Sequence, residues 1–356
     1  MSAVEKFANV PRCNALDRAA IIIPVYNGEP YWGSLSAALM RQGIDKDQIL
    51  VVDSSSTDNS RALAQRSGFQ VKTIPFETFR HGATRQMAAE SLPWAEFLVY
   101  LTQDAVPLGD RSIATLLTAF TDPEVGAAYG RQVARQDAGP IERHARLFNY
   151  PSTTVVRSLE SRKQLGLKAA FFSNSFAAYR RVALEHVGGF PKDTIVSEDV
   201  TVAALMLIAG WKTTYQANAI VTHSHRLSMR AEFSRYFDIG VHHGREKWLV
   251  EEFGSAGGEG LAFVLSEFQF LLKTKRHLIP FATVRNLNKW ISYHIGLHEN
   301  HLHPRIKRLL SGQWAFWLDE RTEGHVERRP HREIHGNNWL HSGGNSKSSE
   351  GVNPHI

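Results

Sequence analysis

Residues 20–25 read Ala-Ile-Ile-Ile-Pro-Val, and residues 49–53 read Ile-Leu-Val-Val-Asp. Both are short, β-branched apolar runs, which is the pattern of strands buried on both faces of a sheet. The segment from Trp32 to Gln42 has helical spacing, with Leu35 and Leu39 on one face. A strand, a helix and a second strand in this order predict a pair of parallel strands joined by a helical crossover.

The same alternation continues to about residue 130. The sequence predicts a helix from Asp58 to Gly68, a strand from Phe69 to Ile74 and another from Phe97 to Thr102. We therefore expect an α/β fold with a mostly parallel central sheet and helices on both of its faces.

The second half of the chain is less regular. A helix is predicted from Ser197 to Ala209 and a strand from Ala219 to His225. The pattern from 231 to about 312 is helical. These patterns divide the chain into four predicted parts: an N-terminal extension (1–18), the α/β domain (19–230), a mainly helical extension (231–319) and a disordered tail (320–356).

Composition limits the function classes. The chain has 356 residues, 43% of them hydrophobic and 21% charged, as expected of a folded protein. Cys13 is the one cysteine, which excludes an intrachain disulfide and a thiolate metal cluster. The N-terminus lacks the apolar run of a signal peptide, and we expect a cytoplasmic chain.

The net charge of +6 fits a basic surface, an anionic lipid or a diphosphate ligand. Zinc-finger spacing and basic heptads are missing, which argues against a nucleic-acid partner.

The carboxyl ends of the predicted parallel strands carry polar residues, and ligands of open α/β sheets bind there. Asp53 ends one strand, and Asp104 follows another. One carboxylate can accept hydrogen bonds from a base or ribose, and the other can hold a divalent metal against phosphates. Turn and helix-capping roles explain Asp53 and Asp58 equally well. The segment after the first strand has no G-x-G-x-x-G, which argues against a nicotinamide-dependent oxidoreductase.

Several motifs resemble one enzyme family. The stretches Ile22–Asn27 and Val51–Asp58 look like the opening of family 2 glycosyltransferases, which have the GT-A fold. The segments Phe79–Arg85, with its HG-x-x-R pattern, and Leu101–Pro107, with Thr-Gln-Asp-Ala, are similar to the rhamnosyltransferase branch. Four further segments share that likeness: Phe172–Ser175, Ser197–Asp199, His223–His225 and Arg235–Val241.

The resemblance implies roles for particular residues. Asp53 would face a pyrimidine ring, Arg85 would pair with the diphosphate, and Asp104 would stand at the last position of the family's D-x-D metal motif. Thr102 replaces the first acid of that motif, so phosphates and water would complete the shell of Mg²⁺ or Mn²⁺. The full implied donor-binding set is Pro24, Val25, Tyr26, Asn27, Asp53, Arg85, Gln103 and Asp104.

The same resemblance makes Asp199 the general base, with Asn174 and Glu198 near the acceptor or behind the base. Ser197 is expected to cap a helix that has Glu198 and Asp199 in its first turn, where the helix dipole favours ionised acids. Stabilisation of that helix start is the alternative role for both acids.

His223 and His225 are two residues apart on a predicted strand, so they would share a face. They are candidate metal ligands beside Asp104, and a structural role is the alternative. The segment from Phe263 to Ile291 mixes aromatic, aliphatic and basic residues, which suits either a membrane surface or packing on the catalytic domain.

The implied activity is inverting transfer of a sugar to a hydroxyl of a cell-surface polysaccharide or a lipid-linked glycan precursor. L-Rhamnose from dTDP-rhamnose is the first expectation. UDP-glucose, UDP-galactose and UDP-GlcNAc are alternative donors, and a non-catalytic glycan-binding protein of the same fold is the more remote alternative. We expect peripheral contact with the inner face of the cell membrane.

Overall fold

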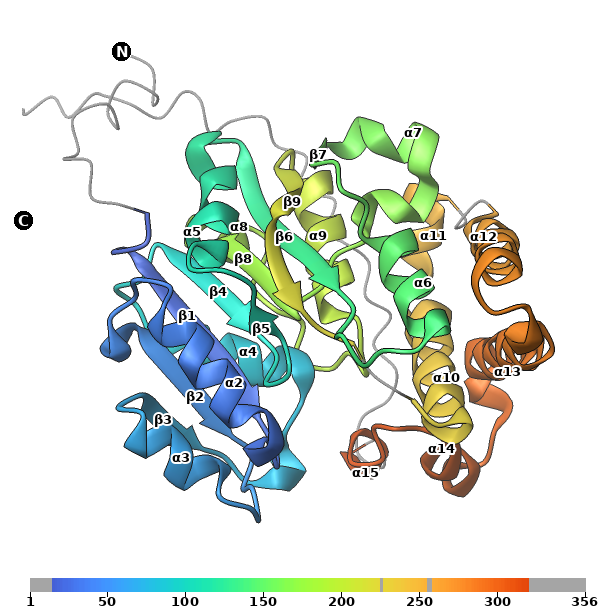
Figure 1. Cartoon of the computed structure of the whole chain (residues 1–356), viewed down its shortest axis with the longest axis horizontal. Coiled ribbons are helices and arrows are strands. Elements are labelled where there is room, and N and C mark those ends of the chain that lie inside the picture. Colours follow the sequence, from blue (N-terminus) through green and yellow to red (C-terminus); the bar gives the residue numbers. More distant parts are fainter. Residues whose placement is uncertain (1–14, 225–226, 255–257, 320–356) are drawn as a thin grey trace, which may run out of the picture.

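A nine-stranded sheet forms the centre of the computed structural model, which describes residues 15–224, 227–254 and 258–319 (Figure 1). Its first edge is parallel. β1 (Ala19–Val25) lies between β2 (Ile49–Asp53) and β4 (Phe97–Leu101), and β3 (Gln70–Thr73) pairs with β2. The apolar runs of the sequence therefore form the parallel strands that they predict.

The other half of the sheet is mixed. β8 (Phe176–Arg180) runs antiparallel to both β4 and β6 (Val125–Val133). β9 (Lys212–Thr222) is parallel to β6, and the short strands β5 (Val106–Pro107) and β7 (Val155–Arg157) run antiparallel to β9. The sheet thus reverses direction next to β4, beside the strand ends that were expected to bind a ligand.

Helices cover both faces of the sheet. α2 (Glu29–Met40), α3 (Ser60–Arg66) and α5 (Ser112–Leu117) pack on the face that receives Ile21 and Ile23 of β1. Successive side chains of a strand point to opposite faces, so Ile22 lies in the other core layer. That layer is covered by three helices: α4 (His81–Glu90), α8 (Arg181–His186) and α9 (Glu198–Ile208).

The C-terminal part is helical. It contains α10 (Met229–Arg245), α11 (Lys247–Phe253), α12 (Glu259–Thr274) and α13 (Ile279–Leu297). Two short helices follow, α14 (Pro304–Leu310) and α15 (Phe316–Asp319). Figure 1 shows α12 and α13 at the outer edge, with α10 between α13 and the sheet. Two further helices lie between β6 and β8 in the sequence, α6 (Pro140–Asn149) and α7 (Arg162–Leu165).

Three local expectations need correction or fall outside the described residues. β9 begins at Lys212 rather than Ala219 and ends at Thr222, so His223 lies just beyond the strand. Ser197 precedes α9, but its hydroxyl makes no capping bond, because its backbone is in the left-handed conformation at φ 61°. His225, Cys13 and the tail predicted to be disordered lie outside the described residues.

Candidate active site

The ends of β1 and β2 form one edge of the site. Parallel pairing sets Val25 beside Asp53, and the two loops beyond them bind each other. The Asn27 N–H donates to the Ser56 hydroxyl (3.0 Å), and the Thr57 N–H donates to the Asn27 side-chain oxygen (2.9 Å). Asn27 adopts a left-handed φ of 49°, which non-glycine residues rarely do outside sites with a special backbone requirement.

Asp53 and Asp58 have different roles. The Asp58 carboxylate accepts hydrogen bonds from the backbone N–H groups of Glu29 and Ser60 and so fixes the turn. This is the turn role that the sequence offered as an alternative to ligand binding. Asp53 is only 1% exposed, and both of its carboxylate oxygens accept long hydrogen bonds from the Ser56 N–H (3.4 and 3.3 Å). The role of Asp53 toward a nucleoside stays a prediction.

Gln103 joins the end of β4 to the end of β1. Its side-chain oxygen accepts from the Tyr26 N–H (2.8 Å), and its amide donates to the Tyr26 carbonyl oxygen (3.1 Å). The side chain of Gln103 therefore continues the ladder between the strands and fixes the Tyr26 backbone. The predicted contact of Gln103 with a donor is not tested by these bonds.

Asp104 and His223 meet beside these strand ends. The His223 Nε2 lies 3.3 Å from an Asp104 carboxylate oxygen, and the His223 Nδ1 lies 2.7 Å from the Gln132 side-chain oxygen. Burial lowers the pKa of His223, while Asp104 opposes that effect. A neutral imidazole beside a carboxylate is a pair of ligands that a divalent metal can use.

The metal-ligand set of the protein is small. Within the described ranges, no group of three or more His, Cys, Asp and Glu side chains could hold a metal ion. The Thr102 hydroxyl, at the position of the missing acid, is buried without a hydrogen-bond partner in that part of the chain. Asp104 and His223 therefore fit a metal whose other ligands come from a diphosphate and water.

A buried ion pair connects α4 to α9. The Arg85 guanidinium lies 2.8 Å from a Glu198 carboxylate oxygen, and both side chains are almost fully buried. Gly82 allows this approach, because a Cβ at that position would lie 1.7 Å from the Pro191 carbonyl oxygen. The structure thus pairs Arg85 with Glu198, and the predicted contact of Arg85 with a diphosphate remains untested.

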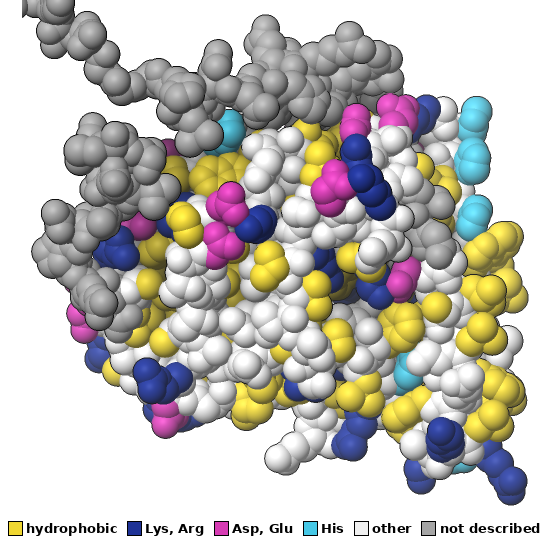
Figure 2. All heavy atoms as spheres, turned by 90° about the horizontal axis from the view of Figure 1, so that it is seen from above, with side chains coloured by type: hydrophobic (Ala, Val, Ile, Leu, Met, Phe, Trp, Pro, Cys, Tyr) yellow, Lys and Arg dark blue, Asp and Glu magenta, His cyan; other side chains and the backbone are white. Residues whose placement is uncertain are grey.

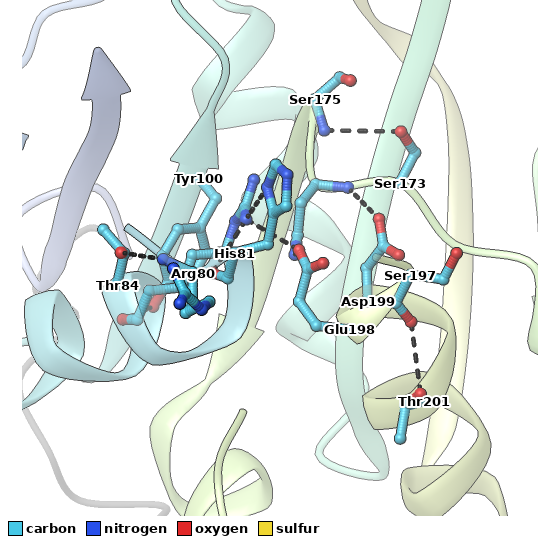
Figure 3. Close-up of polar contacts among 12 residues, drawn as sticks. Arg80, His81, Thr84, Tyr100, Ser173, Ser175, Ser197, Glu198, Asp199 and Thr201 are labelled. Carbon is cyan, nitrogen blue, oxygen red and sulfur yellow. Dashed lines mark hydrogen bonds and ion pairs between the residues drawn. The ribbon is translucent and has the colours of Figure 1, made fainter. Parts of the chain in front are cut away.

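Asp199 follows Glu198 at the start of α9 (Figure 3). Its carboxylate accepts hydrogen bonds from the backbone N–H groups of Asn174 and Val200, each at 2.9 Å. The Asn174 side chain donates to Glu198 (2.9 Å), so Asn174 holds both acids. Burial, and then the charge of Glu198, raise the pKa of Asp199 to about 7.

That pKa suits proton transfer. A general base works best when its pKa lies near the working pH, and Asp199 keeps part of its surface accessible while Glu198 is 4% exposed. Asp199 can therefore take a proton from a bound hydroxyl group, whereas Glu198 is held by Arg85 and Asn174.

Sequence reasoning assigned no role to two arginines near the site. The Arg146 side chain donates to the His223 carbonyl oxygen (2.8 Å), and the charge of Asp104 acts on its guanidinium. Arg235, on α10, lies close enough to lower the pKa of both His81 and His223 in addition to the larger effect of burial. Cations from three separate elements, α4, α6 and α10, thus surround the acidic residues.

An aromatic row beside the β1 end was also not predicted. The rings of Tyr26 and Phe76 are 4.6 Å apart, and the Phe76 and Trp314 rings are 6.0 Å apart. The Arg80 guanidinium donates to the Ala315 carbonyl oxygen (2.9 Å), which holds the C-terminal segment there. Trp314 is 44% exposed, so its indole remains available to a ligand.

Comparisons with known proteins identify the family of this chain. Residues 20–188 match the sequence pattern of glycosyl transferase family 2. The chain is 42% identical over 298 residues to the O-antigen chain rhamnosyltransferase WbaN of Salmonella anatum, covering 83% of this chain and 95% of that protein. It belongs to glycosyl transferase family 2.

Two further comparisons extend this assignment. The O-antigen chain rhamnosyltransferase RfbN of Salmonella typhimurium is 41% identical over 301 residues, covering 84% of this glycosyltransferase and 96% of its relative. The mannosyltransferase PcManGT of Pyrobaculum calidifontis, solved with GDP-Man and Mn²⁺, superposes with a TM-score of 0.55 at 19% identity. That superposition covers 80% of this chain and 88% of the other, and it supports the GT-A fold.

Proposed function

We propose that this glycosyltransferase moves L-rhamnose from dTDP-rhamnose to a hydroxyl of a cell-surface polysaccharide precursor, with inversion at the anomeric carbon. The choice of sugar rests on the two O-antigen chain rhamnosyltransferases, each similar to this chain over more than nine-tenths of its own length. The Asp199 carboxylate lies at the start of α9, next to the Arg85–Glu198 ion pair, and burial raises its pKa to about 7; this is the observation that carries the catalytic assignment.

In the proposed reaction, the acceptor hydroxyl oxygen forms a bond to the anomeric carbon of the sugar. The bond from that carbon to the diphosphate oxygen breaks, and the hydroxyl proton moves to Asp199. Glu198 cannot take this proton in its ion pair with Arg85, because the pKa of Glu198 is lowered, with Arg85 and His81 outweighing the effect of burial. The two neighbouring acids therefore have separate roles.

The leaving group is a nucleoside diphosphate, which needs positive charge in the transition state. Arg146 and Arg235 lie around the Asp104–His223 pair and supply it. We also propose that Asp104 and His223 hold Mg²⁺ or Mn²⁺. When bound, the metal would neutralise charge on the leaving diphosphate. In the same proposal the enzyme works in the cytoplasm, where nucleotide sugars are its donors.

The experiment is a panel of nucleotide sugars, assayed with and without Mg²⁺ or Mn²⁺ by release of nucleoside diphosphate. We expect release with dTDP-rhamnose and an acceptor, and little with UDP-glucose, UDP-galactose or UDP-GlcNAc. Turnover with UDP-glucose alone would overturn the sugar assignment and leave the family intact. No turnover with any donor, together with binding of a glycan, would favour a non-catalytic binding protein.

The assignment of the base has its own test. Asp199→Asn should lower kcat by at least 10²-fold, the usual contribution of a general base, and leave the donor Kd within about twofold. Asp58→Asn is a matched control, since Asp58 is an acid of the same sheet edge that only fixes a turn. An Asp199→Asn enzyme with the parental kcat would show that another residue is the base.

A further inference from the structure

The outer faces of α12 and α13 form a continuous apolar surface. Each helix uses its inner face for packing: His144 of α6 bonds Ser266 of α12 (2.9 Å), and α13 packs along α10. Gly240 fixes that second contact, because a Cβ there would lie 2.1 Å from the Tyr293 carbonyl oxygen. The opposite faces of the two helices point away from the protein (Figure 1).

These outer faces carry large hydrophobic side chains that are 39% to 65% exposed. On α12 they are Leu261, Val264, Leu265, Phe268 and Leu272, and on α13 they are Phe281, Val284, Leu287, Trp290 and Ile291. Figure 2 shows hydrophobic side chains gathered on this edge of the molecule. Contiguous apolar surface of this kind marks an interaction site in a folded protein.

The charges on this surface have one sign. The end of α12 exposes Lys273, and the turn that follows exposes Lys275 and Arg276. The two acids of α12 do not oppose them: Glu259 binds Lys168 (2.6 Å), and Glu267 is 1% exposed and accepts from Asn286. From residue 260 to 298, all of which are described, no exposed position carries a carboxylate. We call the ten hydrophobic residues and these three cations the α12–α13 surface.

We propose that the α12–α13 surface docks on the face of an anionic lipid bilayer. Leu, Phe and Trp side chains enter the boundary between head groups and acyl chains, and the cationic turn contacts anionic head groups. No helix among the described residues is long and apolar enough to cross a membrane. Charge decides between a bilayer and a protein partner, because a run of 39 residues without an exposed acid matches a uniformly anionic surface.

The position of the surface connects it to catalysis. Arg235 of α10 acts on His81 and His223 in the active site, and the same helix packs against α13. One helix therefore separates the bilayer contact from the catalytic residues. An acceptor carried on a membrane lipid would therefore arrive beside α10. This consequence rests on the proposed function. The docking of the α12–α13 surface on a bilayer does not depend on that function.

The test is co-sedimentation of the full chain with vesicles of phosphatidylcholine alone, or of phosphatidylcholine and phosphatidylglycerol in equal parts. We expect binding to the anionic vesicles, weaker binding to the neutral ones, and loss of binding as salt is raised. Phe268→Gln with Leu287→Gln should weaken binding at least tenfold, because two large apolar groups leave the lipid. Lys273→Glu with Arg276→Glu should weaken anionic binding by roughly fivefold or more per charge.

Matched controls keep the result specific. Leu108→Gln with Val182→Gln changes two exposed hydrophobic residues elsewhere, and Arg61→Glu with Arg66→Glu changes two exposed cations elsewhere. Both controls should bind vesicles like the parent. The proposal fails if the parent stays in the supernatant, or if the Phe268/Leu287 variant binds normally. A concentration-dependent dimer that this variant abolishes, without vesicle binding, would assign the surface to a second copy of the chain. Since no substrate is used, failure of the rhamnose assignment leaves this test unaffected.

Discussion

Asp199→Asn should make the enzyme inactive and more stable at alkaline pH. In the wild type, burial and the Glu198 charge raise the pKa of Asp199 from 3.8 to about 7. The folded state therefore holds a proton that the unfolded state releases, so stability falls as pH rises between these two values. A difference of roughly 3 pH units at about 1.4 kcal/mol each gives ~4 kcal/mol, all of it lost above pH 7.

The asparagine variant avoids this loss but weakens a contact. The carboxylate accepts from the N–H groups of Asn174 and Val200, and an amide oxygen at that place can keep only one of these bonds. Losing the other costs ~1–2 kcal/mol. Because residue 199 is only partly buried, we discount the full value and expect a net gain of ~2 kcal/mol at pH 8. At pH 5 the wild type has lost only the share of stability between pH 3.8 and pH 5, ~1–2 kcal/mol, and the weakened hydrogen bond of the variant cancels that gain.

Thermal unfolding of both proteins at pH 5 and pH 8 measures this difference. The variant should unfold ~5 °C higher than the wild type at pH 8 and within a degree or two of it at pH 5. Asp58→Asn provides a control of opposite sign, because hydrogen bonds from Ser60 outweigh burial and lower the pKa of Asp58. That variant should lose stability at pH 8. The reasoning would be refuted if the Asp199→Asn protein were less stable than the wild type at pH 8. It would also be refuted if the difference in unfolding temperature between the two proteins were the same at pH 5 and pH 8.

Three further predictions follow from the site. Glu198→Gln removes the charge beside Asp199, so the acid limb of the kcat profile should move about one pH unit lower. Glu232→Gln, which breaks a comparable buried ion pair in the helical part, should not move that limb. Trp314→Ala should raise the donor KM about tenfold at constant kcat through loss of a stacking surface, whereas removal of the 50% exposed Trp94 should change neither constant. Asp104→Asn should raise the Mn²⁺ concentration needed for half-maximal rate at least tenfold, and an unchanged metal titration would exclude Asp104 as a ligand.

The parts of the fold that the sequence predicts well are those decided by local pattern. β1, β2 and β4 are continuous apolar runs, and they form at the predicted places. β6 was not predicted, because its small residues give little hydrophobic signal. Gly130 is required there by a distant neighbour, since a Cβ would lie 2.3 Å from the Phe176 ring. The need for glycine at position 130 cannot be predicted from the residues next to it in the sequence.

The site shows the same division. The strand-end acids and the first-turn position of Glu198 and Asp199 follow from sequence spacing and family resemblance. The left-handed backbone of Ser197 does not, because Ser at that place is usually a helix cap. Trp314 reaches the site only through tertiary packing, 288 positions along the chain from Tyr26, so no local signal could have found it.

The Arg85–Glu198 ion pair explains how the chain keeps a carboxylate with a pKa near neutrality. A cation placed directly on Asp199 would lower the pKa of that group and leave a weak base. Here the Arg85 guanidinium contacts Glu198 instead, at 2.8 Å, and Asn174 orients both acids through its backbone and its side chain. Glu198 thus remains ionised beside Asp199, and its negative charge adds to burial in raising the Asp199 pKa. Arg85 also lowers the pKa of Asp199 directly, but this effect is smaller than the rise caused by Glu198. The arginine of the HG-x-x-R segment therefore acts on the proposed base both directly and through the acid next to it, which gives a physical reason for the two motifs to occur in one chain.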